Sequence, residues 1–227
     1  MTTPPEPHSS HLSPTPPRTA LRRHKERALG DRAAVDAILD EGMICHLACA
    51  EGGQPWMLPT AYGRDRDHLY LHGAAGNHLL RTAAGAEVVV AVTLLDGMVL
   101  ARSTFNHSFN YRSVGVFGRA AEVTDPAEKA HGLEVIVNRM LPGRTGEARP
   151  PTDAELRQTR VLRIPLTEVS AKARSGPAKD DPEDVALPVW AGVLPLHLTA
   201  GPPEPDAGNA DGLALPVGLD QPVRWKI

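Results

Sequence analysis

Asp67-His-Leu-Tyr-Leu-His72-Gly73-Ala-Ala-Gly76-Asn77-His78-Leu-Leu-Arg81 is the most informative part of the sequence. An apolar strand runs into small residues and then into a helix start at Asn77. Glycines let the backbone approach a ligand closely, and the free N–H groups of a helix start favour an anion. His78 and Arg81 add positive charge. The stretch therefore fits a phosphate site or an ordinary strand–turn–helix corner, and by itself it does not separate the two.

Short strands with turn signals lie on both sides of this stretch. Strands are expected at 44–50, 56–62, 68–72, 87–93, 98–103, 113–123 and 161–172. Asp96-Gly97 predicts a hairpin turn between two of them. Pro59 indicates an edge strand or a bulge, and Pro165 indicates a bend in the last strand.

Helices are expected before and after the strands rather than between them. Asp31 can cap a helix that ends at Gly42, where a left-handed residue is expected. Asp125 and Glu128 predict a capping box for a helix at 126–140, and 152–155 predicts a second box for a short helix. This order excludes a Rossmann sheet and favours a mainly β fold, an antiparallel barrel with peripheral helices.

Composition limits the class of protein. The chain has 227 residues, a formal net charge of −3 and only two cysteines. These values argue against a nucleic-acid-binding surface and exclude a disulfide-stapled fold. No apolar run approaches the roughly 20 residues that cross a bilayer, and no secretory signal is evident, so a cytoplasmic protein is expected. Prolines concentrate near both ends and predict a disordered leader at 1–20, one domain at 21–198, and a linker with a C-terminal tail at 199–227.

Four segments in order resemble one known family. The segments are Gln54-Pro55-Trp56-Met57-Leu58-Pro59-Thr60-Ala61-Tyr62, Leu69-Tyr70-Leu71-His72-Gly73, Phe109-Asn110-Tyr111-Arg112-Ser113-Val114 with Phe117-Gly118-Arg119-Ala120, and Trp190-Ala191-Gly192-Val193-Leu194-Pro195. Together they resemble the pyridoxamine 5′-phosphate oxidase-like superfamily of FMN-binding split barrels. The chain looks closest to the branch that contains the 5-nitroimidazole resistance proteins. The resemblance implies a six-stranded antiparallel split β-barrel over 21–198.

The resemblance also implies a homodimer with two FMN sites at the subunit interface. The cofactor-binding residues that it implies are Pro59, Thr60, Ala61, Tyr62, His72, Gly73, Asn77, His78, Ser113 and Trp190. Within this set, Asn77 and His78 correspond to the phosphate position, where the oxidases proper carry an Arg-Lys pair. Ser113 corresponds to a polar residue near the flavin edge, and Trp190 closes the pocket from the partner chain.

His72 is the candidate for chemistry, since the nitroimidazole-resistance branch has a functional histidine in the Tyr-Leu-His-Gly context. It could donate a proton while the substrate takes up a hydride, or it could only hydrogen-bond the flavin or a strand. The resulting prediction is an FMN-dependent oxidoreductase that acts on a small planar electrophile such as a nitro-aromatic. Two alternatives stay open: a non-catalytic flavin or haem binder with a histidine as axial ligand, and a dimerising domain without a ligand.

Two histidine-containing patterns resemble metal motifs but have unsuitable geometry. On a strand, Cys45 and Cys49 share a face but lie about 13 Å apart, and His46 points to the other face. His68 and His72 have the same separation. No metal site is therefore expected. Phe105 and Phe109 belong to a long aromatic and polar segment, which could stack on a planar ligand or pack into the partner subunit.

Overall fold

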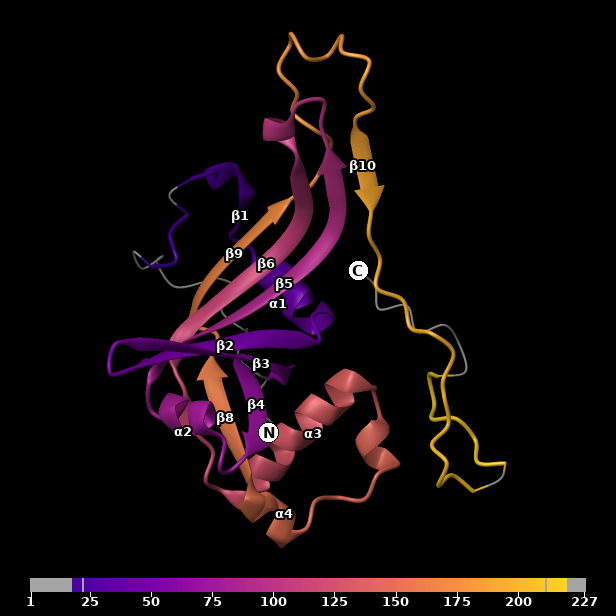
Figure 1. Ribbon diagram of the computed structural model, residues 1–227. Helices are drawn as coiled ribbons and strands as arrows, with labels where there is room; N and C mark the ends of the chain where they lie inside the picture. Colours follow the sequence, from indigo (N-terminus) through magenta and orange to yellow (C-terminus); the bar gives the residue numbers. More distant parts are fainter. Residues whose placement is uncertain (1–17, 22, 211, 220–227) are drawn as a thin grey trace, which may run out of the picture.

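The structure is a computed structural model that describes residues 18–21, 23–210 and 212–219 (Figure 1). Its strands form one antiparallel sheet in the order β1-β9-β6-β5-β2-β3-β4-β8-β7, and β10 pairs with β5. The strands are β1 (Ala28–Leu29), β2 (Ile44–Glu51), β3 (Gln54–Asp65), β4 (His68–Ala74), β5 (Glu87–Leu100), β6 (Ser108–Arg119), β7 (Ala121–Glu122), β8 (Thr159–Pro165), β9 (Glu168–Arg174) and β10 (Gly192–Pro195). The α-helices are α1 (Arg32–Glu41), α2 (His78–Ala83), α3 (Pro126–Met140) and α4 (Asp153–Gln158), and short 3-10 turns lie at Lys25–Arg27, Thr104–Asn106 and Arg144–Gly146.

The mainly β, antiparallel split-barrel prediction is confirmed. The sheet has ten strands rather than six, partly because β1, β7 and β10 add short edge pairings. In addition, the segment expected as one bent strand at 161–172 is two strands. Pro165 ends β8, the backbone N–H of Leu166 donates to the Asp67 carbonyl, and β9 then pairs with β6. The proline therefore terminates the strand instead of bending it.

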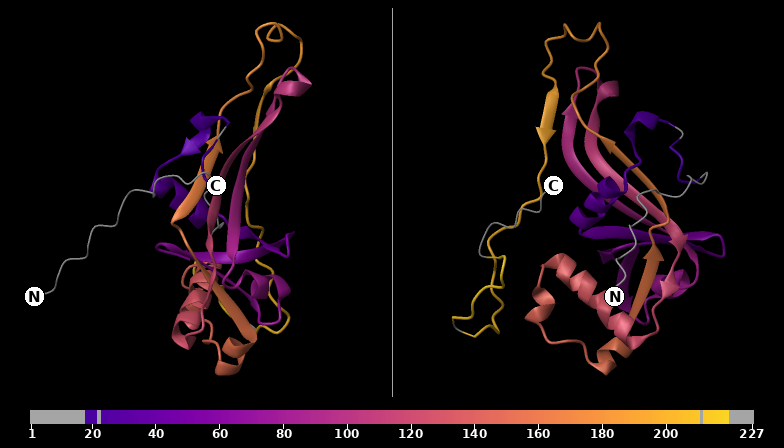
Figure 2. Two further views of the ribbon diagram at one scale, coloured as in Figure 1. Left: turned by 90° about the vertical axis from the view of Figure 1, so that its left-hand side faces the viewer. Right: turned by 180° about the vertical axis from the view of Figure 1, so that it is seen from behind.

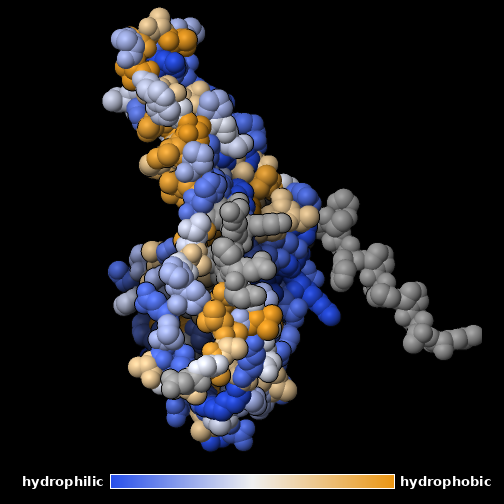
Figure 3. Space-filling model, turned by 90° about the vertical axis from the view of Figure 1, so that its right-hand side faces the viewer, coloured by the Kyte–Doolittle hydropathy of each residue, from blue (hydrophilic) through white to orange (hydrophobic). Residues whose placement is uncertain are grey.

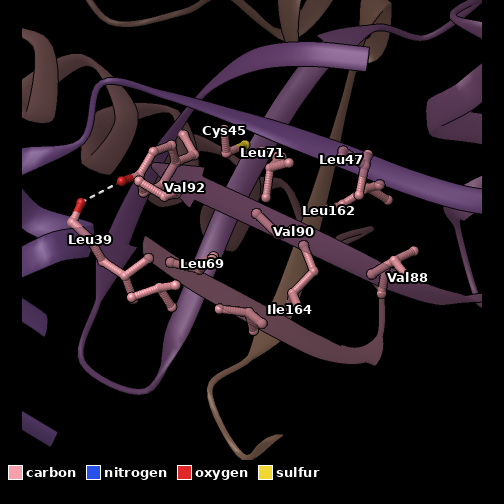
Figure 4. Close-up of a cluster of buried hydrophobic side chains, with 14 of the residues drawn as sticks. Leu39, Cys45, Leu47, Leu69, Leu71, Val88, Val90, Val92, Leu162 and Ile164 are labelled. Carbon is pink, nitrogen blue, oxygen red and sulfur yellow. Dashed lines mark hydrogen bonds between the residues drawn. The ribbon is translucent and has the colours of Figure 1, made fainter. Parts of the chain in front are cut away.

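The main core lies inside the barrel, under α1 and α2. Figure 4 shows Leu47, Leu69, Leu71 and Val90 turned toward one another from three different strands. Each of these four side chains is fully buried. A second, smaller cluster lies between α3 and the β4–β8 pair, and its members are Tyr70, Val123, Ile136 and Val161. The sheet between these two layers therefore carries apolar residues on both faces.

Two glycines have roles other than those that the sequence suggested. Gly42 has a φ of −63°, so the left-handed helix end expected there is wrong. A Cβ at Gly42 would lie 2.4 Å from Val92 Cγ1 and 2.6 Å from the Tyr62 hydroxyl, so close packing requires the glycine. The Asp96-Gly97 hairpin is also wrong, because β5 continues through these residues with a bulge opposite β6. A Cβ at Gly97 would lie 3.1 Å from the Leu194 carbonyl oxygen, where β10 pairs with β5.

The predicted helices are present, with one change in capping. Asp31 and Asp125 accept hydrogen bonds from the backbone N–H groups of Ala33 and Glu128, and Thr152 forms the expected capping box of α4. The Glu128 carboxylate does not complete a box in α3. Instead it accepts a 2.6 Å bond from Arg163 on β8, which fastens the start of α3 to the sheet.

The molecule has a body and an arm, which Figures 1 and 2 show from three sides. The body contains β2, β3, β4 and β8 with α2, α3 and α4. The arm is formed by the far ends of β5 and β6 together with β10. Of the predicted leader, residues 18–20 are described, and there Arg18 pairs with Glu87 and Glu168. The predicted tail contains no helix or strand within 199–210 and 212–219.

Candidate functional site

Strand β3 divides its predicted flavin residues between two faces of the sheet. It pairs with β2 over residues 54–61 and with β4 over residues 62–65. Pro59 belongs to the part that pairs with β2. Pro59 and Ala61 point to the outer face, because side chains alternate along a strand. Thr60 shares the inner face with Tyr62, which is fully buried and donates a 2.5 Å hydrogen bond to the Leu39 carbonyl. The Tyr62 side chain therefore serves the core, and only its backbone remains for a flavin contact.

His72 lies on β4 on the same face as Tyr70, which packs against Gly132 of α3. Pairing places it opposite Val161, a fully buried member of the second apolar cluster. Its Nδ1 is buried and, within the described ranges, has no hydrogen-bond partner. Burial lowers the pKa of the imidazole below its ordinary value of 6.5. His72 is therefore a neutral imidazole at neutral pH, with Nδ1 covered by protein atoms.

The start of α2 holds the two residues predicted to contact phosphate. Asn77 is the N-cap, and its side-chain oxygen accepts a 3.1 Å bond from Leu80 N. His78 Nε2 lies 2.9 Å from a Glu51 carboxylate oxygen, and the Trp56 ring packs edge-on against the imidazole. Gly73 is required by packing, because a Cβ there would lie 2.6 Å from Leu80 Cδ1. Both residues at the predicted phosphate position therefore already have hydrogen-bond partners within the chain. One of these partners, Glu51, places a negative charge beside that position.

Ser113 lies near a small pocket on the outer face of the sheet. It pairs with Thr93, and Ile44 pairs with Ala61 on the neighbouring strands. Thr93 and Ile44 both line a pocket of about 370 Å³. The remaining lining residues are Glu41, Gly42, Met43, Leu94, Leu95, Leu196, His197 and Leu198. The strand partners of Ser113 and Ala61 thus line the pocket, while Ala61 itself packs against the second apolar cluster.

Trp190 lies away from this cavity, on the arm. It precedes β10, which pairs with the far end of β5 at residues 97–100, and its side chain is 68% exposed. Figure 3 shows apolar side chains gathered along this side of the arm. Exposed apolar residues there include Leu187, Val189 and Leu194. Within one chain, therefore, Trp190 is separated from the other predicted site residues.

The structure also shows an ionic cluster that the sequence did not suggest. The Arg112 guanidinium contacts both carboxylate oxygens of Glu41 at 2.5 and 2.7 Å, and it contacts Asp96 at 2.7 Å. The Leu196 backbone N–H donates to the Asp96 carbonyl. The cluster joins α1, the bulge of β5 and the C-terminal segment beside the pocket. Its members are far apart in the sequence and form no local motif, so only the fold brings them together.

Metal-ligand geometry is missing from the part of the chain that the structure describes. No group of three His, Cys, Asp or Glu side chains is placed to hold an ion there. Cys45 and Cys49 are free and buried, and burial raises the pKa of the Cys45 thiol to about 12. That thiol stays protonated near neutral pH and is a poor ligand. Among the described residues, no helix is long and apolar enough to cross a membrane.

A family model of pyridoxamine 5′-phosphate oxidase matches residues 31–173. The chain belongs to this family. The match spans β2 to β9, except the last residue of β9, together with α1 to α4. It therefore confirms the family that the four sequence segments predicted. No curated protein matches the chain.

Two solved structures are similar over nearly the whole chain. The flavocytochrome Anf3 from Azotobacter vinelandii has 37% identity and a TM-score of 0.85, and the match covers 91% of this chain and 98% of that one. The FAD and haem binding protein from Mycobacterium smegmatis has 36% identity and a TM-score of 0.82, with 86% and 96% covered. A proposed 5-nitroimidazole antibiotic resistance protein from Bacteroides thetaiotaomicron has 21% identity, a TM-score of 0.53 and coverage of 64% and 85%, which shows a shared fold alone. The chain thus has the fold of flavin-binding members of this family.

Proposed function

We propose that this protein is a redox protein that binds a flavin and a haem. The observation that carries the proposal is the near-full-length similarity, at 36–37% identity, to two proteins named for both cofactors. The matches cover 91% and 86% of this chain. A bound flavin supplies two-electron chemistry and a haem supplies one-electron chemistry, while the protein binds and orients them.

His72 fits a haem better than it fits proton donation. A general acid must carry a proton at working pH, but burial lowers the His72 pKa and favours the neutral ring. Iron binds the neutral imidazole, and a proximal histidine is a common haem ligand. Because protein atoms cover Nδ1, the other ring nitrogen, Nε2, is the atom that would hold the iron. We therefore assign His72 as the residue that holds the haem iron, in place of the proton donor predicted from the sequence.

The outer face of the sheet fits the flavin ring. This face carries Pro59, Ala61 and Ser113. The 370 Å³ pocket is lined by Ile44, the strand partner of Ala61, and by Thr93, the strand partner of Ser113. The face also exposes large apolar side chains: Ile44 is 51% and Met57 is 67% exposed. Such a patch is typical of a ligand or protein interface. A second copy seated on this face would enclose the ring, so we propose a homodimer in which the partner's arm, including Trp190, closes the site.

The type of flavin nucleotide depends on the start of α2. The predicted phosphate position carries no net positive charge, because Asn77 is neutral and His78 pairs with the acidic Glu51. A mononucleotide depends on its phosphate for much of its affinity, whereas a dinucleotide adds contacts to its second half. We therefore expect FAD to bind more tightly than FMN, which differs from the FMN prediction made from the family resemblance.

The proposal is tested by loading the purified protein with FAD, FMN and hemin in separate titrations. Hemin should give a Soret band that is characteristic of histidine ligation, and His72→Gly should lose it. Added imidazole should restore the band in His72→Gly, because free imidazole replaces the missing ligand. His68→Gly is the matched control: it lies four residues earlier on the same strand and face, and it should keep the band.

Other outcomes select other functions. Flavin absorption without any Soret change, together with flavin-dependent reduction of a nitro-aromatic, would favour the oxidoreductase predicted from the sequence. Sedimentation tests the assembly, and a monomer that still binds flavin at full affinity contradicts the interface. If neither cofactor binds, the proposal is wrong as a whole.

A further inference from the structure

His46 lies on the outer face of the sheet, in the middle of β2. Its neighbours Cys45 and Leu47 are fully buried, and alternation along the strand turns the imidazole the other way, where it is exposed. Within residues 18–21, 23–210 and 212–219, its ring nitrogens have no hydrogen-bond or ion-pair partner. His46 is therefore an exposed donor that the fold itself does not use.

The residues beside His46 on this face are small. Strand pairing aligns one row across β9, β6, β5, β2 and β3, and its members are Ser170, Gly115, Ala91, His46 and Pro59. Between His46 and Ser170 the row contains only a methyl group and a hydrogen, over a width of three strand spacings, or about 14 Å. The Phe117 ring adjoins this stretch, because a Cβ at Gly115 would lie 3.5 Å from its Cε2 atom. A flat group can therefore lie over Ala91 and Gly115 with one edge against His46.

The surroundings of this imidazole are uncharged and largely apolar. The outer-face positions nearest to it on the two neighbouring strands are Met57 and Ala61 on β3 and Val89 and Thr93 on β5. Met57 is 67% exposed, which is typical of a face that a ligand or a partner covers. Once the face is covered, the His46 N–H loses its contact with water, and a buried donor without an acceptor is destabilising. The covering group must therefore bring an acceptor as well as an apolar surface.

We propose that His46 donates a hydrogen bond to an acceptor atom on the edge of the flavin ring and so positions the ring over Ala91 and Gly115. The inference rests on the proposed flavin site of the same face. A flavin ring combines a flat surface with nitrogen and carbonyl oxygen acceptors along its edge, which matches both requirements. Ile44, two residues before His46, and Thr93, two residues after Ala91, line the 370 Å³ pocket, so the ring lies next to that pocket.

FAD titrations of the full-length chain test the contact. His46→Leu removes the donor, and we expect the dissociation constant for FAD to rise by roughly 3- to 10-fold. His46→Gln keeps an N–H donor and should recover part of the affinity. His131→Leu is the matched control, because His131 is an exposed histidine on α3 whose Nε2 lies 2.9 Å from Asp65, and this variant should bind FAD as the wild type does. Without flavin, His46→Leu and the wild type should have similar melting temperatures, since His46 holds no other residue in place.

The midpoint potential of the bound flavin separates a ring contact from a merely structural role. Reduction increases the electron density on the acceptor atoms of the ring, so a donor at its edge raises the potential. His46→Leu should therefore shift the potential to more negative values, and His46→Gln should restore part of the shift.

The position of the ring is tested without changing the donor. Ala91→Leu fills the space beside His46 and should weaken FAD binding more than His46→Leu does. Thr167→Leu, in the exposed turn between β8 and β9, is the control for an added apolar side chain and should leave the affinity unchanged.

The outcomes distinguish this inference from the proposed function. If the wild type binds neither FAD nor FMN, both are wrong. If the wild type binds flavin and His46→Leu equals it in affinity and in potential, the inference alone is overturned. A His46→Leu variant that sediments differently from the wild type, but whose bound flavin keeps the wild-type potential, would assign the acceptor to a partner chain and would also overturn it.

Discussion

The imidazole of His78 lies 2.9 Å from the carboxylate of Glu51, at the helix start where the family resemblance places a phosphate. The same carboxylate accepts a 3.2 Å hydrogen bond from Thr82, one turn further along α2. Glu51 therefore holds α2 to the end of β2 through two side chains. The contact stabilises the corner, but it also places a negative charge where an anion is expected to bind.

Replacement of Glu51 by glutamine should make FMN bind more tightly. The amide keeps one acceptor oxygen, which can still accept from Thr82, and its NH2 can donate to His78, but it removes the charge that repels a phosphate. We expect the FMN dissociation constant to fall by roughly 3- to 10-fold at low salt, and the gain to shrink as salt is added. Isothermal titration of the wild type and Glu51→Gln with FMN measures both effects.

Riboflavin provides the control for that titration, because it has the ring but no phosphate. Its affinity should be the same for the wild type and Glu51→Gln. An equal gain for riboflavin and FMN would place the phosphate elsewhere and would leave α2 as an ordinary strand–turn–helix corner.

The buried state of His72 predicts a pH dependence of stability in the cofactor-free protein. Because burial lowers the pKa of His72 in the folded state, the unfolded chain takes up the proton first as the pH falls. The free energy of unfolding should therefore decrease below about pH 6.5, the ordinary pKa of histidine, and this loss should level off below the folded-state pKa. His72→Gln removes this component. The free energy of unfolding of this variant should therefore vary with pH less steeply than that of the wild type, by up to about 1.4 kcal/mol per pH unit.

Urea unfolding of the wild type and His72→Gln between pH 5 and 8 gives the comparison. The difference between the two proteins should be constant above pH 7 and should change only at lower pH. A difference that stays constant down to pH 5 would mean that His72 is solvated like an ordinary surface histidine, and the argument for a neutral iron ligand would lose its basis.

Local patterns predicted most of the secondary structure but not the long-range contacts of the site. Asp31, Asp125 and Thr152 mark helix starts correctly, because an N-cap depends only on neighbouring residues. Asp96-Gly97 misleads because a bulge and a hairpin turn favour the same residue types, and only the partners β6 and β10 decide between them. The partner of His78 could not be predicted, since Glu51 lies 27 residues away and on another element.

The family resemblance named candidate site residues, but it could not predict their surroundings. It selected Ala61, His72 and Ser113 on the basis of short segments, and the strand partners of Ala61 and Ser113 line one pocket. It also included Tyr62, whose side chain is in the core. His72 pairs with Val161 on β8, which is distant in the sequence, and burial in the fold lowers the His72 pKa. Sequence reasoning could therefore name the histidine as a candidate but could not predict its protonation state.

Substitution of Gly42 by alanine should destabilise the protein although its backbone is not strained. The new Cβ would overlap Val92 Cγ1 and the Tyr62 hydroxyl, which donates to the Leu39 carbonyl. Overpacking of this kind costs about 1–3 kcal/mol, and loss of the buried hydrogen bond adds to it. Thermal unfolding compares this variant with Gly30→Ala, whose Cβ has no neighbour within 4 Å and should leave the melting temperature nearly unchanged. Equal melting temperatures for the two variants would show that the region adjusts freely.

Arg112 should contribute more to stability than a surface arginine, because it holds two carboxylates from different elements. Its guanidinium contacts Glu41 at the end of α1 and Asp96 in the bulge of β5, and all three side chains are at most 26% exposed. Arg112→Met leaves two partly buried negative charges without a partner, and we expect a loss of roughly 1–3 kcal/mol in urea unfolding. Arg119→Met on the same strand is the control: Arg119 is 69% exposed and lies 3.9 Å from Glu87, so its loss should stay below about 0.5 kcal/mol. In a double-mutant cycle, Glu41→Gln should recover part of the stability of Arg112→Met, since it removes one of the stranded charges. If Glu41→Gln instead lowers the stability of Arg112→Met further, the cluster is not held together by charge, and the pocket beside it is positioned by packing alone.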